Sequence, residues 1–117
     1  MSSGNQKVDR EMIEKMMYSE EKYIKEFAEA SISSFSEFKE QFSNHLLNRD
    51  MENLRRAGHK IKPAALMLNL EELMELYSFS KEQLENSADQ SELKNTADKV
   101  NAFCEQVIQD FENIIEN

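Results

Sequence analysis

Apolar residues recur at spacings of three and four along most of the chain, which is the period of an amphipathic α-helix. The period is cleanest near the carboxyl end, where the predicted inward stripe is Leu93, Ala97, Val100, Cys104, Val107, Phe111 and Ile114. A second long helix is predicted from about Ser19 to Leu47. Five of the eight residues in its stripe are aromatic: Tyr23, Phe27, Ser31, Ser34, Phe35, Phe38, Phe42 and Leu46. We expect these two helices to provide most of a shared core.

Two further helices are predicted between them. Asp50 is suited to be the N-cap of the first, because its carboxylate can accept the free amide hydrogens of an opening turn. The inward stripe of that helix is Leu54, Ala57, Gly58, Ile61, Ala64, Ala65 and Leu68. The second begins near Asn69 and carries Leu70, Leu73, Met74, Tyr77 and Leu84. A polar break at 86–91 precedes the last helix.

Helix-capping side chains and short connecting segments complete the predicted architecture. Ser19 and Ser91 are predicted to cap the two long helices. A short helix is expected from about Val8 to Met17, after a flexible N-terminal tail at residues 1–7. Long amphipathic helices with short links predict an all-α protein, an antiparallel four-helix bundle with an additional short N-terminal helix, in one domain over residues 8–117.

Composition agrees with this fold and narrows the classes of function. Only two Gly and one Pro occur in 117 residues, as long helices require, and the formal net charge is -9. Such an acidic chain repels nucleic acid, so we expect no nucleic-acid partner. No apolar run reaches the roughly 18–20 residues of a membrane span, so we expect no membrane partner. Cys104 has no second cysteine to pair with, which fits a reducing, cytoplasmic location.

Candidate chemistry is concentrated at His59. A helical wheel places this residue about 200° round from the inward-facing Ile61, and therefore on the solvent side. The segment from Asp50 to Lys62 carries a net charge of +2, whereas the rest of the chain carries -11. A neutral imidazole is a nucleophile near pH 7, and Lys62, one turn along, can contact a phosphoryl group placed on it. An isolated surface histidine usually has no function, but the small residues and cations around His59 favour a functional site.

Pro63 is the residue directly after Lys62. It has no amide hydrogen, so the carbonyl of His59 loses its usual helical partner and a kink is expected there. A bent helix in a bundle is a sufficient explanation for the proline by itself.

Other candidate sites are weaker. His45 falls in the last turn of its helix, where an imidazolium favours the helix dipole. The two histidines belong to different helices, and no Glu-x-x-His or Cys-x-x-Cys pattern supports a metal site. Ser33, Ser34 and Ser36 lack the glycines of a nucleophile elbow, which argues against a hydrolase. Cys104 lies on an inward stripe and is expected to fill the core.

The His59 segment resembles the histidine-containing phosphotransfer (HPt) domain, whose helix reads roughly Ala-His-x-Leu-Lys-Gly-Ser-Ser. Here Gly58 occupies the small position before the histidine, Ile61 the apolar position and Lys62 the lysine. Ala64 and Ala65 replace the serines, Pro63 replaces the usual Gly, and Asn69 replaces a later Gly. The resemblance extends from about Ser19 to Ile115.

The resemblance implies a phosphoryl carrier rather than an enzyme, with no ATP or hydrolase chemistry of its own. His59 would accept a phosphoryl group from a receiver-domain aspartyl phosphate and pass it to another response-regulator aspartate, while Lys62 steadies the phosphoryl oxygens. No cofactor is implied for this chain, because Mg²⁺ is expected on the receiver. The implied partners are receiver domains of response regulators and hybrid histidine kinases, bound by a monomer. The implied partner-binding residues are Arg55, Arg56, Gly58, Lys60, Pro63 and Leu66.

Two other functions stay open. One is a helical interaction module that binds receiver domains without transferring phosphoryl groups. The other is a histidine-kinase dimerisation hairpin, although those carry the proline one residue later than Pro63 and form tight dimers.

Overall fold

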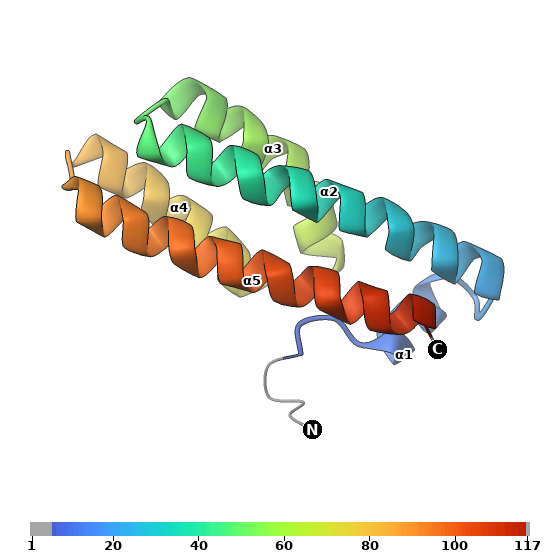
Figure 1. The fold of residues 1–117 in the computed structure, drawn as a ribbon. Coiled ribbons are helices and arrows are strands. Elements are labelled where there is room, and N and C mark those ends of the chain that lie inside the picture. The colour runs from blue at the N-terminus through green and yellow to red at the C-terminus, as the bar shows by residue number, and fades with distance from the viewer. Residues whose placement is uncertain (1–5, 117) are drawn as a thin grey trace.

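The computed structural model describes residues 6–116, which form five α-helices (Figure 1). The short α1 spans Arg10–Met16, and the bundle helices are α2 (Glu21–Leu47), α3 (Met51–Met67), α4 (Glu71–Glu85) and α5 (Gln90–Glu116). Helices α2 to α5 pack antiparallel as a four-helix bundle. The predicted fold class is therefore confirmed, including the additional N-terminal helix.

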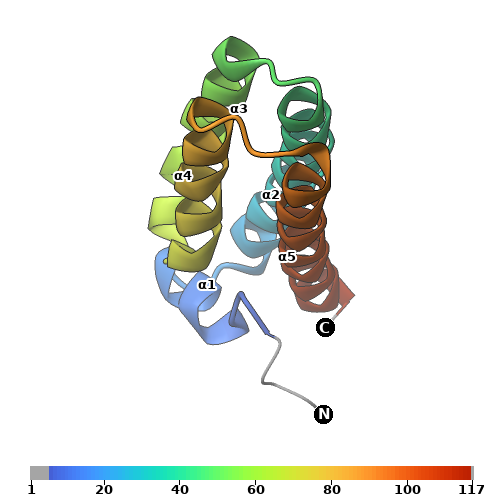
Figure 2. The same ribbon diagram turned by 90° about the vertical axis from the view of Figure 1, so that its left-hand side faces the viewer.

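Helix lengths determine how the layers fit together. Helices α2 and α5 have 27 residues each and pack along one another, whereas α3 has 17 and α4 has 15. At about 1.5 Å per residue, the α3–α4 layer covers less than two thirds of the longer pair. Helix α1 lies at the end that α3 and α4 leave uncovered (Figure 2). Its Ile13 is completely buried there.

Asp110 of α5 fixes the segment that leads into α1. One carboxylate oxygen accepts the backbone N–H groups of Lys7 and Val8, at 2.6 and 2.9 Å, and the other accepts a hydrogen bond from Gln106 at 2.8 Å. Arg10 donates to the carbonyl of Ile114 at 2.7 Å. Lys7, predicted to belong to a flexible tail, is therefore bound to α5. Residues 1–5 of that predicted tail lie outside the described residues.

The core follows the predicted stripes closely, except at the start of α2. All seven predicted inward residues of α5 are buried, and so are those of α3 apart from the half-buried Ala64. In α2, however, Ile24 and Ala28 are buried, whereas Tyr23 is 52% exposed. Ser34, also predicted to face inward, is exposed. The early part of the α2 stripe was therefore predicted one residue out of register.

Of the three N-cap residues predicted from the sequence, one is correct and two are wrong. The Asp50 carboxylate accepts the backbone N–H of Asn53 at 3.2 Å, which confirms it as the N-cap of α3. Ser19 is not the cap of α2, because it has a φ of 59° and Glu20 takes that position. Ser91 is not the cap of α5, because Asp89 accepts the amide hydrogen of Glu92 at 3.0 Å.

Residues in the left-handed conformation end α2, α3 and α4. Arg49, Asn69 and Ser87 have φ values of 57°, 58° and 57°. In each turn the following residue donates its amide hydrogen back to a carbonyl of the helix, as in the bond from Leu70 to Ala65 at 2.8 Å. Asn tolerates this conformation better than most residues other than Gly, so Asn69 can replace a glycine and still reverse the chain.

Candidate functional site

His59 lies on the outer face of α3. The side chain is exposed, as the helical wheel predicts, and no group of residues 6–116 is hydrogen-bonded to its imidazole. Asp50 holds the start of this helix, and hydrogen bonds from the side chain and the backbone N–H of Asn53 lower the pKa of Asp50. The histidine is therefore presented to solvent on a helix with a fixed first turn.

Pro63 lies within α3, and the helix continues past it to Met67. The carbonyl of His59 has no amide hydrogen to accept at position 63. In Figure 1 the last turns of α3 bend away from the direction of its earlier turns, which is the expected effect of a proline inside a helix. Because Pro63 and His59 are both exposed, this carbonyl lies on the side of the helix that faces water.

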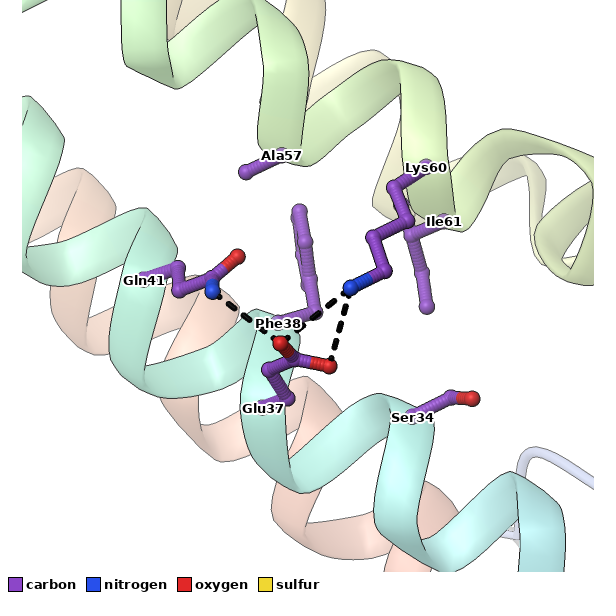
Figure 3. Close-up of a pocket in the computed structure, with 7 residues that line it drawn as sticks. All are labelled: Ser34, Glu37, Phe38, Gln41, Ala57, Lys60 and Ile61. Atoms are coloured by element: carbon purple, nitrogen blue, oxygen red, sulfur yellow. Dashed lines mark hydrogen bonds and ion pairs between the residues drawn. The ribbon is translucent and has the colours of Figure 1, made fainter.

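On the side of α3 that faces α2, Lys60 forms an ion pair with Glu37, with 3.2 Å between Nζ and Oε2. Gln41 donates to the same carboxylate at 3.2 Å. Figure 3 shows these groups at the mouth of a small recess over Phe38. The recess is also lined by Ser34, Ala57 and Ile61. The charge of Lys60 is thus directed toward α2 rather than toward His59.

On the side that faces α4, Gly58 is covered by the ring of Tyr77. A methyl group added to Gly58 would overlap with Cζ and Cε1 of that ring. The Tyr77 hydroxyl donates to the carbonyl of Arg55 at 3.4 Å, and burial raises the pKa of this phenol despite the nearby Arg55. Gly58 is therefore buried, and its part in the site is to let α4 approach the backbone directly beside His59.

The cations of α3 differ in how far their charge is neutralised. Arg55 pairs with Glu85 of α4 at 3.7 Å, and Arg56 pairs with Glu52 at 3.0 Å. Exposed pairs of this kind contribute about 0–1 kcal/mol, but they place a carboxylate beside each guanidinium. Lys62 is exposed and forms no ion pair with a carboxylate of residues 6–116. Of the four predicted cations, Lys62 is the one whose charge no carboxylate in the described chain offsets.

An apolar surface adjoins these polar groups. Leu66 is 60% exposed and Met67 is 52% exposed, and both follow Pro63 at the end of α3. Leu66 is one turn beyond Pro63 and two turns beyond His59, so the three side chains lie along one outer face of the helix. Exposed aliphatic side chains beside a reactive group suit a protein partner better than a small polar ligand.

The other candidate groups do not join this site. His45 is half-buried in the last turn of α2, as predicted, and its carbonyl accepts the amide hydrogen of Asp50 at 2.8 Å. Cys104 is fully buried, which raises the pKa of its thiol to about 12 and leaves it un-ionised at neutral pH. Within residues 6–116 no group of three or more His, Cys, Asp or Glu side chains is placed to hold a metal ion.

The described helices also include none that is both long and apolar enough to cross a membrane.

Comparison with known proteins adds no family to this geometry. No protein-family model matches the chain, and no significant match was found among curated proteins or solved structures. Any assignment of function therefore depends on the residues of the site.

Several groups around His59 were not predicted from the sequence. Glu37 and Glu85 come from neighbouring helices and neutralise cations that the sequence alone counts as a local excess of positive charge. Tyr77 was predicted to face the core, but not to lie against Gly58. A glycine inside a helix is a signal of close approach by another group, although it does not say which residue approaches.

Proposed function

We propose that this chain is a histidine phosphotransfer protein that carries a phosphoryl group on His59 between receiver domains. The observation that carries the proposal is an exposed imidazole without a hydrogen-bond partner in the described chain, one helical turn from an unpaired lysine, on one face of an antiparallel bundle. The resemblance of the segment from Gly58 to Lys62 to the HPt motif supports the same function.

The chemistry requires only a nucleophile and a cation from this chain. A lone pair of the neutral His59 imidazole attacks the phosphorus of an aspartyl phosphate on the receiver. The bond from phosphorus to the carboxyl oxygen breaks, its electron pair stays on the aspartate, and the proton on the other ring nitrogen is released to solvent. Transfer onward is the reverse of this step on a second receiver. Mg²⁺ on the receiver would offset the charge of the phosphoryl oxygens during both transfers.

The charge pattern fits an acidic partner. Lys62 can contact the phosphoryl oxygens as a point charge. Arg55, Arg56 and Lys60 are exposed and their ion pairs are weak, so each can exchange its carboxylate within the chain for one in the acidic pocket of a receiver. Pro63 and Leu66 provide apolar contact area on the same face. Gly58 contributes indirectly, because it is buried against Tyr77.

The four long helices surround one core within a single chain, which favours this proposal over a dimerisation hairpin. Phe35, Phe42 and Phe111 are each completely buried inside one copy of the chain. A kinase hairpin needs a second copy to complete its four-helix core, so sedimentation should find a monomer here. An interaction module without transfer would share this fold and differ only in whether His59 becomes labelled.

The decisive experiment is incubation with a receiver domain carrying a labelled aspartyl phosphate. We expect label on this chain that is lost in acid and stable in base, as a phosphohistidine is. His59→Gln should abolish the label, whereas the matched His45→Gln variant should keep it. Label that persists in His59→Gln would remove His59 from the proposal, and binding of the receiver without any label would favour the interaction module.

A further inference from the structure

Lys81 of α4 is a second cation beside the His59 site. Its Nζ lies 4.5 Å from the centroid of the Tyr77 ring. That ring covers Gly58, the residue before His59. Lys81 is half-buried, and no ion pair joins it to a carboxylate of residues 6–116. An aromatic face attracts an ammonium group, so Tyr77 restricts where this charge can lie.

The contacts on either side of Lys81 place it across the groove from the turn of α3 that leads into His59. Helices α3 and α4 are antiparallel, and the ion pair between Glu85 and Arg55 spans the groove between them. Tyr77 spans the same groove to reach Gly58. Lys81 is one turn from both Tyr77 and Glu85, on the same face of α4. It therefore faces the turn of α3 from Arg55 to Gly58, directly before His59.

The direction of the His59 side chain agrees with this placement. At about 100° per residue, His59 is about 100° round the helix from Gly58, which faces α4. It is about 160° round from Ala57, which lines the recess against α2. Lys62 is only about 40° from Gly58. His59 and Lys62 thus both lie on the flank of α3 nearer to α4, the flank that Lys81 faces.

We propose that Lys81 is an electrostatic component of the His59 site, which together with Lys62 places positive charge near a phosphoryl group on the imidazole and lengthens its lifetime. This inference depends on the proposed phosphotransfer function for its biological meaning. Lys60, although next to His59 in sequence, cannot take this role as easily because Glu37 holds it toward α2.

The longer lifetime follows from the mechanism by which a phosphohistidine is hydrolysed. Water attacks phosphorus, the N–P bond breaks with its electron pair going to the ring nitrogen, and phosphate leaves with one hydrogen of the water. The other hydrogen ends on the imidazole. The ring leaves more readily when its second nitrogen is already protonated. Two nearby ammonium groups oppose that additional positive charge and slow the reaction.

The test uses the whole chain and potassium phosphoramidate, a small reagent that phosphorylates imidazole directly. His45→Gln is present throughout, so that His59 is the one histidine labelled. The half-life of the phosphohistidine is followed by ³¹P NMR in the parent and in Lys81→Gln, Lys81→Arg and Lys99→Gln. Lys99 is an exposed lysine of α5, so its variant matches the change in net charge.

We expect Lys81→Gln to shorten the half-life about two- to fivefold, the effect of one unit charge several ångströms away in a solvated site. Lys81→Arg should restore it, and Lys99→Gln should leave it unchanged. High salt should shorten the half-life in the parent more than in Lys81→Gln. Equal half-lives for Lys81→Gln and the parent, or an equal effect of Lys99→Gln, would overturn the inference.

No receiver takes part in this measurement, so the two proposals can fail separately. Absence of receiver-dependent labelling would end the phosphorelay proposal while the half-lives still report on Lys81. Unchanged half-lives would end the role of Lys81 and leave receiver-dependent labelling of His59 untouched.

Discussion

Helices α3 and α5 both bury one apolar stripe. Packing explains almost every position of α5, but it leaves several positions of α3 unexplained. In α5 all the predicted inward residues are buried, and no glycine or proline interrupts the helix. In α3 packing explains Gly58, which makes room for Tyr77. It does not explain the exposed His59, the internal Pro63 or Lys62, which has no ion pair within residues 6–116. Departures from helix rules that bring no packing gain are where function is most reasonably sought.

The largest loss of stability should come from a substitution in α5, where packing explains the sequence fully. Phe111 is completely buried and its ring meets Phe27 edge-on, with centroids 5.9 Å apart. Phe111→Ala should lower the free energy of unfolding by about 3–5 kcal/mol, measured by urea denaturation. Phe79→Ala is the matched control, because Phe79 is 50% exposed and its loss should cost less than about 1 kcal/mol. Similar losses in both variants would contradict this description of the core.

Gly58→Ala should have the next largest effect, a loss of about 2 kcal/mol in the free energy of unfolding. The added methyl group would overlap with the Tyr77 ring, and the cost of moving that buried ring exceeds the gain of about 1 kcal/mol in helix propensity.

Repeating the Gly58→Ala substitution in a Tyr77→Leu variant isolates the contact between Gly58 and Tyr77. In Tyr77→Leu the ring is absent, so Gly58→Ala should become neutral or stabilising by up to about 1 kcal/mol. If Gly58→Ala destabilised both backgrounds equally, the role of Gly58 would lie somewhere other than the contact with α4.

Pro63→Ala should give the smallest change, and one of opposite sign. An alanine restores an amide hydrogen to the carbonyl of His59, so the free energy of unfolding should rise by about 1–2 kcal/mol. The gain is smaller than the full proline penalty of about 3 kcal/mol because the bend already accommodates the ring. Met67→Ala, at an exposed position of the same helix, should change stability by less than about 0.5 kcal/mol. A destabilised Pro63→Ala variant would mean that packing requires the bend, and α3 would then resemble α5.

The fold could be predicted because the apolar period is strong in every bundle helix. The prediction was wrong where the largest apolar side chain does not lie on the face of the helix that packs against the core. At the start of α2 the large Tyr23 seemed the better core residue, yet the small Ala28 and its neighbour Ile24 are buried. At Ser19 and Ser91 a suitable capping residue was present, but Glu20 and Asp89 lie at the helix starts instead. Caps depend on local backbone angles that a list of suitable residues does not determine.

The site could be predicted only along α3 itself. Exposure of His59, Lys62 and Leu66 follows from the helical period alone. The contacts from Glu37, Tyr77 and Lys81 do not, because they depend on the rotation and height of α2 and α4 relative to α3. Nothing in the sequence of a single helix specifies those two quantities.

The anchor at Asp110 determines how far this protein can be shortened from its amino end. A truncation that begins at Glu11 would remove both backbone donors to a carboxylate that is only 4% exposed, together with the Arg10 contact to Ile114. Of the hydrogen bonds described for Asp110, only that from Gln106 would remain, and a buried charge that loses most of its partners is unfavourable. A minimal domain for crystallisation or for fusion to a reporter should therefore retain Lys7 and everything after it, even though α1 stands outside the four main helices.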